Sequence, residues 1–228
     1  MTTQTELVNS HAKDFSTTNK LRFVTAASLF DGHDAAINIM RRILQQEGAE
    51  VIHLGHNRSV EEIVEAAIEE DAQAIAISSY QGGHVEFFKF MVELLQQRGC
   101  SHIRVFGGGG GTITDSEIKA LHAAGVERIY SVEDGRLMGL VGMIRDMMTR
   151  ADFSTVQADA EIPAGLPHRQ AAAVAQTITI LEKLHEEGCP ADKRARLKDL
   201  RVAFTKQLPA NAPLILGMTG TGGAGKSS

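Results

Sequence analysis

The chain is poor in cysteine and has no long apolar run, and these absences exclude several classes of protein. Its two cysteines, Cys100 and Cys189, are too few for a disulfide framework and lack the paired spacing of a zinc site. No segment approaches the roughly 20 apolar residues of a membrane-spanning helix, and residues 1–20 lack the apolar core of a signal peptide. We therefore expect a cytoplasmic protein with reduced thiols.

Positive charge is also scarce. The 23 lysines and arginines are outnumbered by 28 acidic residues, which gives a net charge of −5. A nucleic-acid binder neutralises phosphates with clustered cations, whereas the short basic run at 193–196 is better explained as a solvated helix face. With 43% hydrophobic and 22% charged residues, the composition is typical of a soluble globular domain that binds neither nucleic acid nor membrane.

Short β-rich runs alternate with helical patterns from residue 20 to about residue 150, which predicts βαβ units. The predicted strands are 21–29, 50–54, 74–78, 103–106 and 128–131, and the predicted helices lie near 34–47, 59–70, 84–98, 114–124 and 136–149. The predicted fold is therefore α/β: a flavodoxin-like, doubly wound, five-stranded parallel sheet of order 2-1-3-4-5. Ligands of such sheets bind at the carboxyl ends of the strands.

The predicted domain organisation has four parts. An N-terminal segment (1–19) precedes the sheet domain (20–150), and a partly helical linker (151–212) follows, with helices near 168–187 and 191–207. An apolar strand at 214–218 and a glycine-rich stretch then predict the first strand and P-loop of a truncated G domain (213–228).

Unusual residues gather at the predicted carboxyl ends of the strands. Asp31, His33 and Asp34 follow the first strand, Ser78-Ser79-Tyr80 close the third, five glycines at 107–111 follow the fourth, and Ser131 ends the fifth. Each motif alone has an ordinary explanation, since the aspartates could cap a helix and the glycines could form a flexible loop. Their joint position favours a ligand site.

Three motifs in this order carry a resemblance to a known family. "DGHDAA" at 31–36, "SSY" at 78–80 and "GGGGG" at 107–111 resemble the Asp-x-His-x-x-Gly, Ser-x-Leu and Gly-Gly signature of cobalamin-binding domains in the methionine synthase and methylmalonyl-coenzyme A mutase group. The resemblance covers about residues 20–150. It departs at Ala36, where the signature has glycine, and at Tyr80, where it has leucine; these departures suggest a subfamily.

The resemblance implies a role for each matching residue. His33 is implied to coordinate the cobalt from below while Asp31 accepts a hydrogen bond from its other ring nitrogen. Ser78 is implied to bond the dimethylbenzimidazole tail, which leaves the cobalt and enters a slot in the domain. The complete implied cofactor site comprises Asp31, Gly32, His33, Asp34, Ser78, Tyr80, Gly107, Gly108, Gly109 and Ser131.

A second motif, "GTGGAGKS" at 220–227, matches a P-loop after an apolar strand. Backbone N–H groups from Gly220 to Gly225 would cradle phosphates, Lys226 would reach the terminal phosphates and Ser227 would bind Mg²⁺. The helix that must hold the phosphates is absent, so this chain is not expected to form a working nucleotide site.

The order of cobalamin domain, linker and P-loop is similar to that of fused isobutyryl-coenzyme A mutases. This resemblance implies an adenosylcobalamin-dependent isomerase that is a homodimer when full length, with GTP and Mg²⁺ in its G domain and the acyl-coenzyme A substrate in a missing barrel domain. We expect no catalytic acid or base in this chain, which should bind the cofactor and catalyse nothing alone.

Two other functions compete with this interpretation. A corrinoid methyl carrier serving a methyltransferase would use the same His33 and Asp31, but it gives no reason for a P-loop, and only about 20 residues precede the first strand. A flavodoxin-like or receiver module would place its acceptor aspartate after a central strand, and His33 beside Asp31 does not suit that role.

Overall fold

The computed structural model describes residues 15–156 and 170–185, together with the isolated residues 163, 195, 198, 199 and 202. In this part of the chain five parallel strands form one sheet in the order β2-β1-β3-β4-β5, which confirms the predicted flavodoxin-like topology. The strands are β1 (Arg22–Ser28), β2 (Glu50–Arg58), β3 (Ala74–Ser78), β4 (Arg104–Gly108) and β5 (Arg128–Tyr130). The helices are α2 (Ala35–Gln46), α3 (Val60–Glu69), α4 (His84–Gln97), α5 (Asp115–Ala123), α6 (Val132–Ala151) and α7 (Ala171–His185), with a short 3-10 turn, η1, at Gly110–Thr112.

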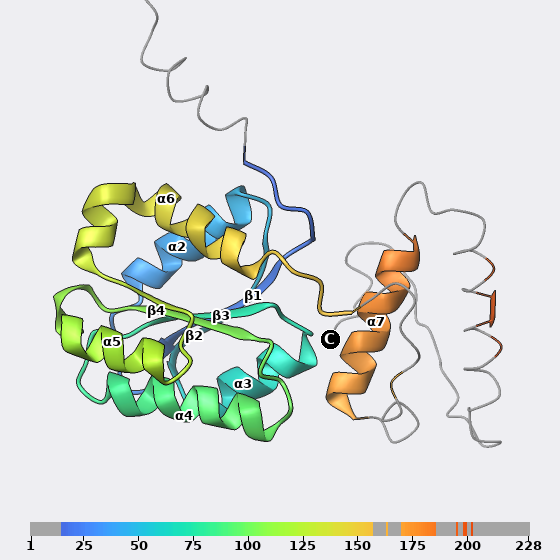
Figure 1. Ribbon diagram of the computed structural model, residues 1–228, viewed down its shortest axis with the longest axis horizontal. Helices are drawn as coiled ribbons and strands as arrows, with labels where there is room; N and C mark the ends of the chain where they lie inside the picture. Colours follow the sequence, from blue (N-terminus) through green and yellow to red (C-terminus); the bar gives the residue numbers. More distant parts are fainter. Residues whose placement is uncertain are drawn as a thin grey trace, which may run out of the picture. The chain divides into compact units, whose positions relative to one another are not determined.

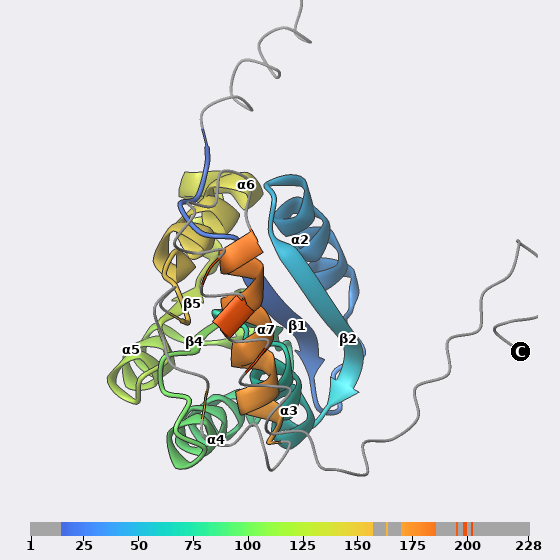
Figure 2. The ribbon, with the colours of Figure 1, turned by 90° about the vertical axis from the view of Figure 1, so that its right-hand side faces the viewer.

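Helices cover both faces of the sheet. Helices α2 and α6 lie on one face, and α3, α4 and α5 lie on the other (Figure 1). The view turned by 90° shows the same two layers with the sheet between them (Figure 2). Alternate residues of each strand therefore face different cores, as expected for a parallel sheet buried on both sides.

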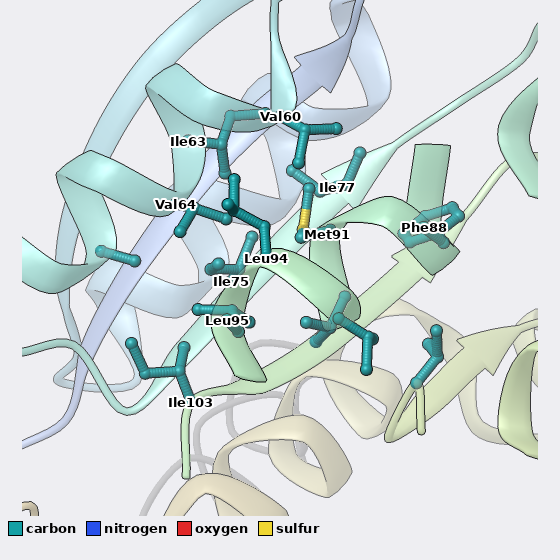
Figure 3. Close-up of a cluster of buried hydrophobic side chains, with 14 of the residues drawn as sticks. Val60, Ile63, Val64, Ile75, Ile77, Phe88, Met91, Leu94, Leu95 and Ile103 are labelled. Atoms are coloured by element: carbon teal, nitrogen blue, oxygen red, sulfur yellow. The ribbon is translucent and has the colours of Figure 1, made fainter. Parts of the chain in front are cut away.

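The core beneath α3 and α4 is closely packed. Val60, Ile63 and Val64 of α3 meet Met91 and neighbouring side chains of α4 over β3 (Figure 3). Phe88 of α4 is fully buried in the same core. The second core, between the sheet and α2 and α6, contains Phe23, Leu44, Phe106, Tyr130, Met143, Ile144, Met147 and Met148.

In the described part of the chain three helices begin with a capping box, in which the side chain of each of two residues accepts a hydrogen bond from the backbone N–H of the other. The pairs are Ser59 and Glu62 in α3, Thr114 and Glu117 in α5, and Ser131 and Asp134 in α6. By contrast, neither Asp34 before α2 nor Gly83 before α4 provides a side-chain cap. These two helices follow β1 and β3, the strands at which the order of the sheet reverses.

Two element boundaries of the sheet domain differ from the sequence prediction by four residues, and the others differ by at most two. Strand β2 continues to Arg58 instead of ending at residue 54, because its pairing with β1 resumes after register shifts and ends at Ser28↔Arg58. Helix α6 begins at Val132 rather than 136, because Ser131 and Asp134 form a cap. It also contains a break at Gly139, whose φ of 65° and ψ of 174° are not helical.

The C-terminal predictions are described only in part. Helix α7 lies within the helix predicted near 168–187. Most of the helix predicted near 191–207, and all of the strand at 214–218 and the P-loop at 220–227, lie outside the described residues, as do residues 1–14. None of the helices in the described part is long and apolar enough to cross a membrane.

Gly107 of β4 allows α4 to pack closely on the sheet. A Cβ at position 107 would lie 2.2 Å from Cζ of the fully buried Phe88. We therefore expect Gly107→Ala to lower the free energy of unfolding by about 1–3 kcal/mol, the usual cost of overpacking a core. Urea denaturation followed by circular dichroism measures it.

Gly111→Ala is the matched control, because a Cβ there has no atom within 4 Å. It should change the free energy of unfolding by less than about 0.5 kcal/mol. Equal effects of the two substitutions would show that close packing on Phe88 is not what requires glycine at position 107.

Candidate functional site

The loops that follow β1, β3 and β4 meet at the carboxyl edge of the sheet. The order of the strands reverses between β1 and β3, so the chain leaves these two neighbouring strands toward opposite faces and opens a crevice between the connections. Asp31 and His33 lie in the first loop and Tyr80 in the second; of the glycine run, Gly107 and Gly108 end β4 and only the last three glycines lie in the third loop, because β4 pairs as far as Gly108. The structure therefore brings together the three sequence motifs.

Asp31 is a buried carboxylate that binds two loops at once. Its Oδ1 accepts hydrogen bonds from the backbone N–H of His33 at 2.9 Å and from the His33 ring nitrogen Nδ1 at 2.8 Å. Its Oδ2 accepts from the backbone N–H of Tyr80 at 2.5 Å. The side chain of Asp31 has no solvent exposure.

These hydrogen bonds determine the charge state of Asp31. Burial by itself raises the pKa of a carboxyl group. The N–H of Tyr80 and the two groups of His33 oppose this effect, and the net result is a pKa below the ordinary value for aspartate. Asp31 is therefore ionised at neutral pH and accepts from all three donors.

The hydrogen bond from His33 to Asp31 fixes the tautomer of the imidazole. A carboxylate can only accept, so the proton of the neutral ring is on Nδ1 and Nε2 keeps its lone pair. The side chain of His33 is 74% exposed, although its Nδ1 is held by a buried group. The ring also lies 5.7 Å from the ring of Tyr80, centroid to centroid. His33 thus presents an imidazole of fixed orientation at the surface.

The ordinary explanation for the two aspartates, helix capping, does not agree with the structure. Asp34 occupies the N-cap position of α2, but its side chain makes no capping hydrogen bond. The carboxylate of Asp31 is committed to His33 and Tyr80. Asp34 and Gly32 are exposed in the same loop.

The loops after β3 and β4 are also in close contact. Ser79 donates its backbone N–H to the carbonyl of Gly108 at 2.9 Å. A Cβ at Gly109 would lie 1.8 Å from the carbonyl oxygen of Ser79, and one at Gly110 would lie 3.0 Å from the ring of Tyr80. Glycine is therefore required at position 109 by the fold itself.

A cavity of about 290 Å³ lies between the sheet, α2 and α6. This volume is close to the lower end of the range for small-molecule sites, about 300–1,000 Å³. Of the predicted site residues, those that line it are Ser78, Tyr80, Gly107, Gly108, Gly109 and Ser131. A Cβ at Gly108 would make an ordinary contact, 3.4 Å from the carbonyl oxygen of Tyr130.

Ser78 provides a buried polar atom that lacks a partner. Its Oγ is inaccessible to solvent and makes no hydrogen bond, and the residue lines the cavity. Buried hydroxyl groups are normally paired, so an unpaired hydroxyl beside a cavity indicates a missing acceptor or donor. Ser131 differs, because its hydroxyl both donates to and accepts from Asp134 in the cap of α6.

The apolar walls of this cavity were not predicted from the sequence. They come from the facing sides of α2 and α6 and include Ile37, Met40, Leu44, Leu140, Met143, Ile144 and Met147. Helical spacing could have shown that these residues share buried faces. The sequence also did not predict the unusual position of Phe30 in the loop after β1. Its side chain is 80% exposed, its φ is 62°, and its backbone N–H donates to Asn57 Oδ1 at 3.0 Å.

Comparison with known families agrees with this fold. The profile of the B12 binding domain family matches residues 21–136, which include all five strands, and the chain belongs to this family. Two similar proteins are fused isobutyryl-CoA mutases. That of Geobacillus kaustophilus is 59% identical over 208 residues, and that of Cupriavidus metallidurans is 58% identical over 210 residues.

These relatives are much longer than the chain. The matches cover 91% and 92% of this chain but 19% and 18% of the two relatives, so the chain spans about a fifth of their length. The pivalyl-CoA mutase small subunit of Xanthobacter autotrophicus is 35% identical over 113 residues, which are 50% of this chain and 74% of that protein.

The buried carboxylate makes the site sensitive to acid. Because the pKa of Asp31 is lower in the folded state, its contribution to stability is complete above the unfolded pKa, about 3.9, and is lost as pH falls through the lower folded value. We expect the stability difference between the wild type and Asp31→Asn to shrink as pH falls below about 4. Urea denaturation at a series of pH values measures it.

Asp34→Asn is the control at neutral pH. The Asp34 side chain is exposed and makes no cap, so this substitution should change stability by less than about 0.5 kcal/mol. A stability difference for Asp31→Asn that does not change with pH would contradict the predicted role of the ionised carboxylate.

Proposed function

We propose that this chain binds cobalamin with the tail base in the cavity and with His33 as the protein ligand of the cobalt. The observation that carries the proposal is the 2.8 Å contact between Asp31 Oδ1 and Nδ1 of the exposed His33 ring, which places the ring proton on Nδ1 and leaves the lone pair on Nε2. A metal-binding histidine usually donates its other ring nitrogen to a carboxylate in this way.

The residues around the cavity fit a buried nucleotide tail. The cavity is lined mainly by apolar side chains, which suit an aromatic base, and it contains the unpaired hydroxyl of Ser78. Gly107, Gly108 and Gly109 contribute backbone rather than side chains to its wall. Ser78 is proposed to hydrogen-bond the tail base, and Tyr80 and Ser131 to flank it.

Asp31 is proposed to set the properties of His33. A carboxylate that accepts the Nδ1 proton makes Nε2 a better electron donor and restricts rotation of the ring. The remaining hydrogen bond, from Tyr80 N–H, keeps this carboxylate in place. Gly32 and Asp34 complete the loop that presents the ring.

For the longer protein we propose the carbon-skeleton isomerisation of isobutyryl-CoA to n-butyryl-CoA, because the relatives carry the name fused isobutyryl-CoA mutase. Adenosylcobalamin would supply a cobalt–carbon bond whose homolysis starts radical chemistry. The acyl-CoA would bind in a barrel domain outside this chain, and the full-length enzyme is proposed to be a cytoplasmic homodimer.

The P-loop sequence supports a second, nucleotide-binding function of the longer protein. Gly220, Gly225 and Lys226 are proposed to bind the phosphates of GTP, and Ser227 to bind Mg²⁺. A corrinoid methyl carrier is less well supported, because three of the similar proteins are named acyl-CoA mutases or their subunits.

Replacement of the ligand tests the cobalt site. Titration of the purified chain with hydroxocobalamin, followed by visible absorbance, should give saturable binding. His33→Ala should weaken it by at least about tenfold, because a metal–nitrogen bond is lost. In the Co(II) form, the nitrogen splitting of the EPR signal should change when histidines carry nitrogen-15.

His102→Ala is the matched control, since His102 is an exposed histidine that precedes β4, at the opposite end of the strand from the glycine run. Its affinity and EPR signal should equal those of the wild type. Absence of cobalamin binding, or an unchanged nitrogen signal in His33→Ala, would refute the proposed ligation.

Ser78→Ala tests the tail site separately from the cobalt. The free protein should be as stable as the wild type or slightly more stable, because an unsatisfied buried hydroxyl is removed. Cobalamin affinity should nevertheless fall by about tenfold, the value of a lost buried hydrogen bond. Unfolding and binding curves measured on the same sample give both values, and a loss of stability without a loss of affinity would mean that Ser78 is purely structural.

A further inference from the structure

The cavity between α2 and α6 contains unusually few available polar atoms. Its walls are formed by aliphatic and methionine side chains from both helices and by Ala76 and Tyr130 of the sheet. The hydroxyl of Tyr130 is already used, because it donates to Asp146 Oδ2 at 2.9 Å. A ligand in this cavity therefore meets mainly hydrocarbon.

Several other polar groups that line the cavity are also occupied. Ser131 Oγ is engaged in the cap of α6. The carbonyl of Gly108 accepts from Ser79 N–H, and that of Gly109 accepts from the hydroxyl and the N–H of Thr112. Tyr80 is only partly buried. Among the described lining residues, Ser78 Oγ is the buried side-chain oxygen without a partner.

One buried, unpaired hydroxyl in a mainly apolar cavity matches one kind of tail base. Dimethylbenzimidazole has a single unsubstituted ring nitrogen, and its fused benzene ring and two methyl groups need no polar partner. Adenine, the tail of other natural corrinoids, has an exocyclic amine and several ring nitrogens. Burial of such groups without hydrogen-bond partners is costly.

Building on the proposed function, we propose that this cavity selects corrinoids by their tail base. It accepts a benzimidazole tail and rejects a purine tail. Discrimination of this kind, in which unpaired polar atoms of the ligand are buried, is expected to be about 10- to 100-fold in affinity.

Three corrinoids test the proposal on the purified wild-type chain. They are cobalamin, the corresponding adenine-tailed corrinoid, and cobinamide, which has no nucleotide tail. Dissociation constants are measured by visible absorbance, with the same upper ligand throughout. Cobalamin should bind at least about tenfold more tightly than the adenine-tailed corrinoid and more tightly than cobinamide.

A polar wall should reduce the discrimination. Met143 is 5% exposed and lines the cavity, and glutamine has nearly the shape of methionine but adds an amide that can pair with adenine. Met143→Gln should lower the ratio of the two dissociation constants by several-fold. Met147→Gln is a second variant of the same kind, in case the first does not fold.

Met148→Gln is the matched control. Met148 lies on the same helix and is fully buried in the same core, but it does not line the cavity. This substitution should destabilise the chain without changing the ratio of the two dissociation constants, because a general loss of stability affects both corrinoids equally.

The outcomes separate this inference from the proposed function. If cobalamin and the adenine-tailed corrinoid bind equally well, or cobinamide binds as tightly as cobalamin, the selectivity proposal is wrong although cobalamin binding stands. If Met148→Gln changes the ratio as much as Met143→Gln does, the cavity wall is not its source. If cobalamin does not bind at all, the proposed function fails and the selectivity proposal fails with it.

Discussion

The buried carboxylate of Asp31 is the interaction on which the site depends. One oxygen holds the ring and the backbone of His33, and the other holds the backbone of Tyr80, so the loops after β1 and β3 are joined through a single charged group. The loop after β3 in turn contacts the glycine run through Ser79. An ionised group can be buried here because N–H donors satisfy both oxygens.

The two faces of the sheet differ in how closely they are packed. The core beneath α3, α4 and α5 is closely packed, and Phe88 there leaves no room for a side chain at Gly107. The side beneath α2 and α6 encloses a cavity of about 290 Å³, whereas protein interiors are normally close-packed. Close packing on one face of the sheet thus coexists with a cavity on the other.

Much of the fold follows from local sequence signals. The strands and helices were predicted because the alternation of apolar runs with helical patterns is strong, and the sheet order was confirmed. The start of α6 was missed although Ser131 and Asp134 have capping-box spacing, because aspartate replaced the usual glutamate. The extension of β2 depends on its register with β1, which local pattern does not encode.

The site was predictable in its residue types but not in its contacts. Motif spacing placed Asp31, His33 and Ser78 at one edge of the sheet, and the structure brings them there. The Tyr80 contact to Asp31 uses a backbone N–H, which has no signature in the sequence. The cavity could not be predicted from the sequence either, because it depends on how the side chains of two helices and a sheet pack together.

The packing of Gly107 and Gly109 has a consequence for the history of this domain. A side chain at either position collides with the protein's own atoms, so selection for folding alone preserves both glycines. Ser78 and His33 have no such protection, because one is an unpaired hydroxyl and the other is largely exposed. A descendant that no longer bound a ligand would therefore keep the glycines and lose the serine and the histidine. The serine and the histidine are thus the better indicators that a related domain still binds a ligand.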